Sequence, residues 1–153
     1  MAATAKNHMV WKDKFRKPEI DELRGQYPRT VRSLFDDARQ RILAFDGLAE
    51  ELSWEGLPWR WCLRYVKQGD PTRAFAFLVP SPEKPRIGVS FTGEMLQAMP
   101  LHRLKKYMKE ILVASHDVGG MFWTEFEISS RPQLDDTMDL VRRKHNLIVA
   151  KGA

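Results

Sequence analysis

The sequence contains very little cysteine and no long hydrophobic run. Cys62 is the one cysteine among 153 residues, which excludes the internal disulfides that stabilise small secreted domains. The longest purely apolar run extends from Ala74 to Val79, far short of the ~20 residues that a membrane-spanning helix needs. Residues 1–14 also lack the apolar segment of a signal peptide. We therefore expect a cytoplasmic protein without a membrane partner.

Apolar and charged residues are present in the proportions of an ordinary folded domain. Hydrophobic residues make up 43% of the chain and charged residues 29%, and the chain is long enough for one domain with its own core. Near the N-terminus, basic residues follow one another closely. We predict a basic, partly disordered leader over residues 1–16 and a single α+β domain over residues 17–150.

The excess positive charge is concentrated near the N-terminus. The formal net charge is +5, and residues 1–33 hold eight Lys or Arg against four Asp or Glu. A folded nucleic-acid-binding domain instead carries a basic face on its body. Weak nucleic-acid binding through the leader and the 102–109 helix is therefore an alternative function. Its candidate residues are Lys12, Lys14, Arg16, Lys17, Arg103, Lys105, Lys106 and Lys109.

Apolar residues recur at helical spacing in several stretches. The spacing predicts an amphipathic helix over residues 28–47, another over 101–112, and a C-terminal helix capped by Ser129 or Ser130. A short helix over residues 19–23 precedes them. The inward stripe of the C-terminal helix is expected to be Leu134, Met138, Val141, His145 and Ile148. Its basic residues Arg142, Arg143 and Lys144 are expected near the C-terminal end of the helix dipole.

Period-two alternation predicts four strands separated by turns. They cover residues 59–65, 74–79, 87–91 and 122–128. In the first strand, the apolar set that should face the core is Trp59, Trp61, Leu63 and Tyr65, with Arg60, Cys62 and Arg64 on the opposite face. The fold class predicted is α+β: an antiparallel sheet of four or five strands, arranged as a meander, with helices packed on one face.

The polar face of this sheet is the most informative candidate site. If the strands are neighbours, its arginines could face the late strand. The candidate ligand-binding residues are Arg60, Arg64, Trp123, Glu125, Glu127 and Trp54. Such a face fits three interpretations: solvated cross-strand ion pairs, a pocket for a carboxylate or phosphate beside an aromatic ring, or a protein interface. We predict a non-catalytic binding module for an anionic or aromatic small molecule or a protein partner.

Residues suited to catalysis or metal binding are few. Cys62 is either a reactive thiol flanked by arginines or, more commonly for a lone strand cysteine, a small packed side chain. His102 and His116 lack helical metal-ligand spacing, and His145 fits a core position. We predict no metal, cofactor or catalytic residue. The second alternative is an enzyme that uses Glu125 or Glu127 as general base. Of the two, we expect a binding protein rather than an enzyme.

Several short motifs resemble known families. The residues that carry the resemblance are Trp54, Gly56, Trp61, Leu63, Arg64, Tyr65, the run Phe77-Leu78-Val79-Pro80, Gly120, Glu127-Ile128-Ser129, Leu140 and Lys144. In this order, over residues 11–145, they resemble the family named domain of unknown function 3788, with Arg60 where that family has glycine. Residues 52–58 also resemble small iron-chaperone-like (YdhG-like) domains, with one residue inserted. The resemblance implies a small α+β domain and brings no catalytic residue set.

Overall fold

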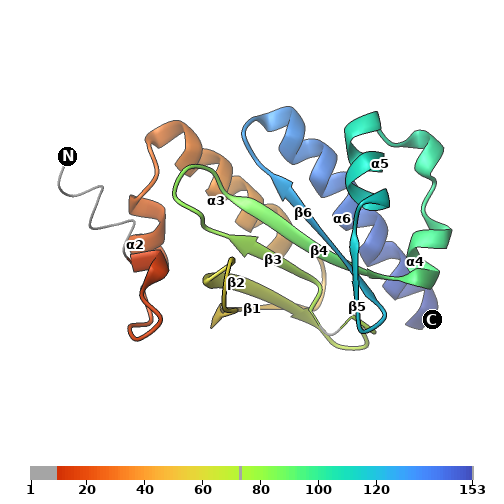
Figure 1. The fold of residues 1–153 in the computed structure, drawn as a ribbon, viewed down its shortest axis with the longest axis horizontal. Helices are drawn as coiled ribbons and strands as arrows, with labels where there is room; N and C mark the ends of the chain where they lie inside the picture. The colour runs from red at the N-terminus through yellow and green to blue at the C-terminus, as the bar shows by residue number, and fades with distance from the viewer. Residues whose placement is uncertain (1–9, 73, 153) are drawn as a thin grey trace.

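The computed structural model describes residues 10–72 and 74–152, and its centre is a six-stranded antiparallel sheet (Figure 1). The strands are β1 (Leu48–Trp54), β2 (Trp61–Lys67), β3 (Ala76–Val79), β4 (Arg86–Thr92), β5 (His116–Val118) and β6 (Met121–Glu127). Their order is β1-β2-β3-β4-β6-β5. The predicted α+β class, antiparallel pairing and mostly meander order are confirmed, but the sheet has six strands instead of four or five.

The two additional strands lie at the sheet edges. β1 pairs with β2 over seven residues, from Leu48 opposite Lys67 to Trp54 opposite Trp61. Its sequence, LAEELSW, contains good helix formers and no clean alternation, so the pairing with β2 decides its conformation. β5 has only three residues, and all three are exposed. Its sequence therefore shows no alternation of apolar and polar residues from which a strand could be predicted.

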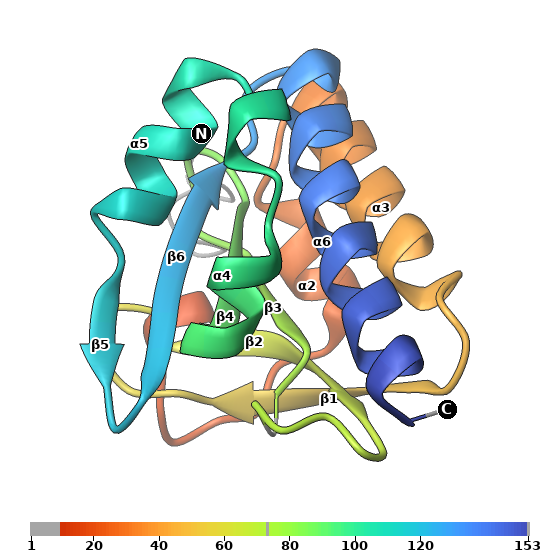
Figure 2. The same ribbon diagram turned by 90° about the vertical axis from the view of Figure 1, so that its right-hand side faces the viewer.

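Helices pack against the sheet (Figures 1 and 2). They are α2 (Ile20–Gly25), α3 (Arg29–Leu43), α4 (Gly93–Ala98), a 3-10 turn (Leu101–Arg103), α5 (Lys106–Val113) and α6 (Arg131–Gly152). The helix predicted over 101–112 is therefore interrupted, and α4 was not predicted. α3 and α6 lie side by side in both views, in accordance with their contacts.

The main core lies between α3–α6 and one face of the sheet. Fully buried members include Phe35 and Ile42 from α3, Leu63 and Tyr65 from β2, and Phe91 from β4. A second, smaller cluster forms on the other side, around the start of β2, and combines Trp11, Leu23, Trp61, Cys62 and Phe77 with neighbouring residues. Because β2 carries apolar side chains on both faces, both sides of the sheet are partly covered there.

The start of the first predicted strand is wrong by two residues. Trp59 and Arg60 belong to the loop between β1 and β2, which closes through two backbone bonds: Arg60 N–H donates to Gly56 O at 2.6 Å and Glu55 N–H to Arg60 O at 2.8 Å. Arg60 has φ 60°, a left-handed conformation incompatible with a strand. The alternation of apolar and polar residues continues through Trp59 and Arg60, so the predicted strand begins two residues too early, inside the loop.

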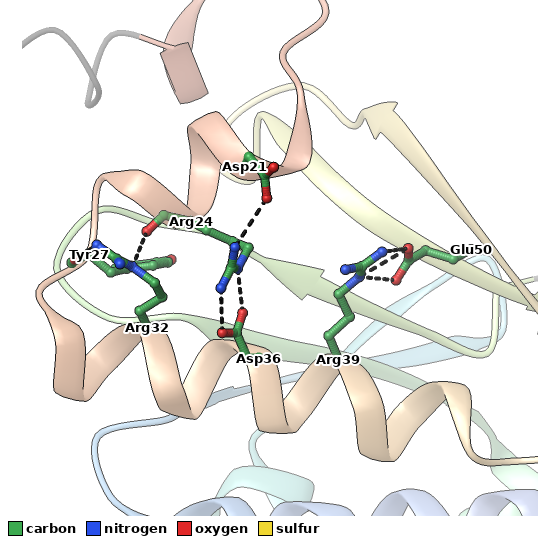
Figure 3. A network of polar contacts seen from close by, with 7 residues as sticks. All are labelled: Asp21, Arg24, Tyr27, Arg32, Asp36, Arg39 and Glu50. Atoms are coloured by element: carbon green, nitrogen blue, oxygen red, sulfur yellow. Dashed lines mark hydrogen bonds and ion pairs between the residues drawn. The ribbon is translucent and has the colours of Figure 1, made fainter.

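Polar contacts tie α2, α3 and β1 together (Figure 3). The Arg24 guanidinium donates to both carboxylate oxygens of Asp36, at 2.6 and 2.7 Å. Arg39 donates to Glu50, with its closest contact at 2.8 Å, and the Tyr65 hydroxyl donates to the same carboxylate at 2.8 Å. The side chains of the two arginine–carboxylate pairs are partly exposed, so each pair contributes ~0.2–1 kcal/mol and chiefly fixes orientation.

Among the helices of the described part of the chain, none combines the length and the apolar character that crossing a membrane requires.

Candidate functional site

The face of the sheet opposite α3–α6 carries three aromatic rings in mutual contact. Phe77 from β3 and Trp123 from β6 lie on this face, with ring centroids 5.6 Å apart. Trp59, from the β1–β2 loop, contacts Phe77 at 5.1 Å and Trp123 at 5.6 Å. Edge-to-face and tilted pairs at such distances contribute beyond the area that they bury. We call these three residues the aromatic trio.

Gly88 makes room for the aromatic trio. It lies directly opposite Phe77 and Glu125 in the sheet, between β3 and β6. A methyl group at this position would lie 2.3 Å from Cη2 of Trp59, well inside van der Waals contact. The Trp59 ring therefore rests on bare backbone, and only glycine permits this approach.

A cavity of about 540 Å³ opens beside the aromatic trio. Phe77, Trp123 and Met121 give it an apolar floor, and Arg64 and Glu55 supply opposite charges. A volume of this order suits a small organic molecule, and a mixed apolar lining with a few polar groups is typical of ligand sites. We call it the sheet cavity.

Arg64 presents its guanidinium at the sheet cavity while it pairs with the edge strand. Its Nη1 donates to Glu51 Oε1 at 2.9 Å, and the two side chains are 33% and 53% exposed. A pair this exposed contributes little to stability. The guanidinium can therefore exchange its partner for a carboxylate or phosphate at low cost, with the planar donor geometry that suits such groups.

One wall of the sheet cavity comes from residues 70–72 and 74–75, between β2 and β3. Pro71, Thr72 and Ala74 line the cavity. The Thr72 hydroxyl and N–H donate to Asp70 Oδ1 at 2.6 and 2.8 Å, which folds the segment into a tight turn. We call residues 70–72 and 74–75 the wall segment.

Lys144 of α6 lies directly behind the wall segment. Its side chain is fully buried, and Nζ donates to Phe75 O at 2.8 Å and to Thr72 Oγ1 at 2.9 Å. Burial lowers the pKa of Lys144 from its ordinary value of 10.5 to about 7, and the charge of Asp70 opposes part of that effect.

Sequence reasoning missed the inward position of Lys144 by placing it with Arg142 and Arg143 near the helix dipole. The available signal was its spacing, because Lys144 lies three residues after Val141 and four before Ile148 on the buried stripe. His145, predicted for that stripe, is half-buried and packs its ring 5.0 Å from Phe45.

Two of the predicted ligand-binding residues, Arg64 and Trp123, come together at the sheet cavity. The expected proximity of Arg64 to Glu125 is wrong, because β3 and β4 lie between β2 and β6, a separation of three strand spacings of ~4.8 Å. Glu125 instead accepts a bond from Arg86 at 2.9 Å. Glu127 lies 3.4 Å from Lys84 and 3.9 Å from Arg86.

The predicted roles of Arg60 and Trp54 also change. Arg60 does not share a strand face with Arg64; its guanidinium lies over the Trp11 ring, 5.4 Å from the centroid, a cation–π contact. Trp54 packs edge-on against Trp61 at 5.6 Å and belongs to the second cluster. Trp59, predicted for the core side, forms part of the aromatic trio instead.

Cys62 is a packed side chain in this structure. It is fully buried, and its Sγ–H donates to Trp59 O at 3.4 Å. Burial raises the pKa of the Cys62 thiol above its ordinary value, and the carboxylates of Glu55 and Glu125 act in the same direction. Within the described residues, no group of histidine, cysteine and acidic side chains is arranged to hold a metal ion.

The basic residues of the nucleic-acid alternative fall into two separate groups. Lys12, Lys14, Arg16 and Lys17 precede α2, whereas the second group surrounds α5 at the opposite end of the long axis of the molecule (Figure 1). Several are already paired: Arg16 with Glu22 at 2.5 Å and Lys105 with Asp136 at 3.1 Å. Lys106, Lys109 and Arg103 lie on or next to α5. The structure does not bring the two groups into one continuous surface.

The fold and the site thus define an α+β domain with a cavity on the face of its sheet opposite α3–α6. Comparison of the chain with models of known families, with sequences of characterised proteins and with solved structures gave no match. The resemblance to the domain of unknown function 3788 family therefore stays a prediction.

Proposed function

We propose that the protein is a non-catalytic binding module whose sheet cavity takes a small molecule with an aromatic ring and an anionic group. The observation that carries the proposal is the convergence of Arg64, Phe77 and Trp123 on one cavity of about 540 Å³. A ring in the ligand would stack on the aromatic floor, and its carboxylate or phosphate would replace Glu51 as the partner of Arg64.

Catalysis by Glu125 or Glu127 has less support than binding. Both carboxylates are engaged with cations, Glu125 with Arg86 and Glu127 with Lys84 and Arg86. A general base needs a free carboxylate within reach of a bound substrate, and neither of these two residues lines the sheet cavity.

The test is the change in melting temperature and in tryptophan fluorescence on addition of aromatic carboxylates and phosphates. A ligand at a hundred times its dissociation constant stabilises the folded protein by ~2.7 kcal/mol, which raises the midpoint by several degrees. Arg64→Ala should abolish the shift. Arg41→Ala is the matched control, because Arg41 is 35% exposed and pairs with Asp135 at 2.7 Å, on the opposite side of the sheet.

Binding of every panel member with equal affinity by wild type and Arg64→Ala would contradict the proposal. A shift produced only by oligonucleotides and lost at moderate salt would favour the nucleic-acid alternative, because phosphate-driven binding weakens steeply with salt. Absence of any shift would favour a protein partner on this face.

A further inference from the structure

The sheet cavity carries a carboxylate as well as a guanidinium. Among the described residues that line it, Glu55 and Arg64 are the charged ones. A ligand that offers only an anion meets Arg64 favourably and Glu55 unfavourably, because like charges in a partly enclosed site repel each other. The lining therefore favours a ligand with a positive group in addition to the anionic group of the proposed function.

Glu55 differs from the other carboxylates on this face of the sheet. Glu51 accepts a bond from Arg64 at 2.9 Å. Glu125 accepts one from Arg86, also at 2.9 Å. Glu55 forms no ion pair in the part of the chain that the structure describes. Its negative charge is therefore available to a ligand, whereas the charges of its neighbours are already compensated.

Two hydrogen bonds hold Glu55 where β1 passes into the β1–β2 loop. Its backbone N–H donates to Arg60 O at 2.8 Å, and the Ser53 hydroxyl donates to Glu55 Oε2 at 2.5 Å. Oε1 takes part in neither bond. The carboxylate is thus oriented from one side and keeps an acceptor oxygen for an ammonium group, which has three donors and no acceptor.

Arg64 is the direct neighbour of the aromatic trio. It lies opposite Phe77 in β3, and Phe77 lies opposite Gly88 in β4, against which the Trp59 ring rests. These residues form one row across the sheet. A ligand whose ring stacks on the trio therefore reaches the guanidinium with a short acidic arm, in the planar geometry that suits a carboxylate.

Glu55 lies farther along the hairpin than Arg64. The residue opposite Arg64 in β1 is Glu51, and Glu55 comes four residues after it. Four residues of extended backbone correspond to ~13 Å. Two charges on a single carbon atom of a ligand are too close together to suit both side chains at this separation. An extended dipeptide spans ~7 Å, and the two long side chains cover the rest.

We infer that the sheet cavity selects an aromatic zwitterion with separated charges: Arg64 receives its carboxylate, Glu55 receives its ammonium, and its ring rests on the aromatic trio. A short peptide with an aromatic residue and both termini free is the simplest molecule of this class. The inference rests on the proposed function and narrows its ligand. It disfavours nucleotides, because their phosphates carry no ammonium and are repelled by Glu55.

Calorimetric titration with four matched probes tests this assignment. They are Gly-Phe, N-acetyl-Gly-Phe without the ammonium, Gly-Phe amide without the carboxylate, and free phenylalanine with both charges on one carbon. At pH ~6.5 the free amino groups are protonated and the free carboxyl groups ionised. Gly-Phe should bind wild type most tightly. Loss of either charge should raise the dissociation constant about three- to tenfold.

Glu55→Gln separates the charge of this residue from its shape. The amide keeps the length of the side chain and an oxygen that accepts from Ser53, but it removes the negative charge. Gly-Phe should bind this variant about three- to tenfold more weakly than wild type. N-acetyl-Gly-Phe should bind it at least as tightly as wild type, because the repulsion is gone.

Two further variants complete the design. Arg64→Ala should weaken the binding of Gly-Phe and N-acetyl-Gly-Phe and leave that of Gly-Phe amide unchanged, since the amide has no carboxylate for the guanidinium. Glu83→Gln is the matched control for Glu55→Gln. Glu83 is an exposed carboxylate in the loop between β3 and β4 and does not line the sheet cavity, so this variant should bind all four probes as wild type does.

The outcomes separate the inference from the proposed function. Arg64-dependent binding of N-acetyl-Gly-Phe as tight as that of Gly-Phe, or an equal effect of Glu55→Gln and Glu83→Gln, would overturn the inference and leave the proposed function standing. Binding of phenylalanine as tight as that of Gly-Phe would overturn the separation of the charges. If none of the four probes binds while simple aromatic carboxylates do, the inference is wrong and the proposed function stands. Absence of binding by every aromatic anion would overturn both.

Discussion

The indole ring of Trp59 lies against the backbone of Gly88, with no space for a side chain between them. Gly88→Ala would place its methyl group 2.3 Å from Trp59 Cη2, so the ring must move and with it the aromatic trio. Overpacking of this kind costs ~1–3 kcal/mol of unfolding free energy, measured by urea denaturation, and ligand binding in the sheet cavity should weaken.

Gly93→Ala is the control for Gly88→Ala. A methyl group at Gly93 would meet Phe122 at 3.7 Å, an ordinary contact, at the start of α4. Its stability should be equal to or above that of wild type. Equal stability of Gly88→Ala and wild type would show that Trp59 can leave Gly88 without cost, contrary to our expectation.

The free energy of unfolding should rise with pH because of Lys144. The folded-state pKa of about 7 lies below the unfolded value of 10.5, so above pH ~7 the unfolded chain binds the extra proton and stability rises by up to ~1.4 kcal/mol per pH unit. Above pH ~10 the buried Tyr27 and Tyr65, whose pKa values are raised by burial, reverse this trend.

Urea denaturation from pH ~6 to ~9.5 checks the expected rise. The slope should disappear in Lys144→Met and persist in Lys106→Met. Parallel pH profiles for wild type and Lys144→Met would assign the effect to other groups.

Trp11 should contribute to stability although it lies in the predicted leader. It is 8% exposed, and its Nε1–H donates to the carbonyls of Trp59 at 3.1 Å and Trp61 at 3.0 Å. Trp11→Phe removes the indole N–H donor from both carbonyls and should cost ~1–3 kcal/mol, and Trp11→Ala ~3–5 kcal/mol. Phe15→Ala, at a residue 93% exposed, should change the denaturation midpoint little. Equal denaturation midpoints for all three variants would mean that Trp11 is not packed against the β1–β2 loop in the protein in solution.

Cys62 should be inert toward thiol reagents in the folded protein. Complete burial denies access, and the raised pKa of the Cys62 thiol keeps it protonated at neutral pH. The reaction of Cys62 with a thiol reagent, monitored by absorbance, should be slow in buffer and rapid after unfolding in guanidinium chloride. Rapid labelling of folded protein would restore the hypothesis of a reactive thiol.

Much of the fold could be predicted because it follows local patterns. The alternation of Leu63 and Tyr65 with polar residues and the helical spacing of Leu34, Ala38 and Ile42 each report one buried face. β1 could not be predicted in this way, because its strand conformation comes from pairing with β2. Arg60 was misplaced because residue type does not reveal a positive φ.

The candidate site was predictable only in part. Arg64 and Trp123 were identified by type, as a cation and a ring on strand positions, and both line the sheet cavity. Their supposed partner Glu125 was wrong, because strand order determines which side chains meet and local periodicity carries no information on that order.

The sequence by itself determined the α+β class, the antiparallel pairing and most of the helices, since these depend on residue spacing along the chain. Tertiary structure decided the rest: that Trp59 lies on Gly88, that Arg64 and Trp123 share a cavity, and that Lys144 is buried behind Thr72. These relations join residues distant in sequence, and the energies that fix them arise only when helix and sheet layers close around the same space.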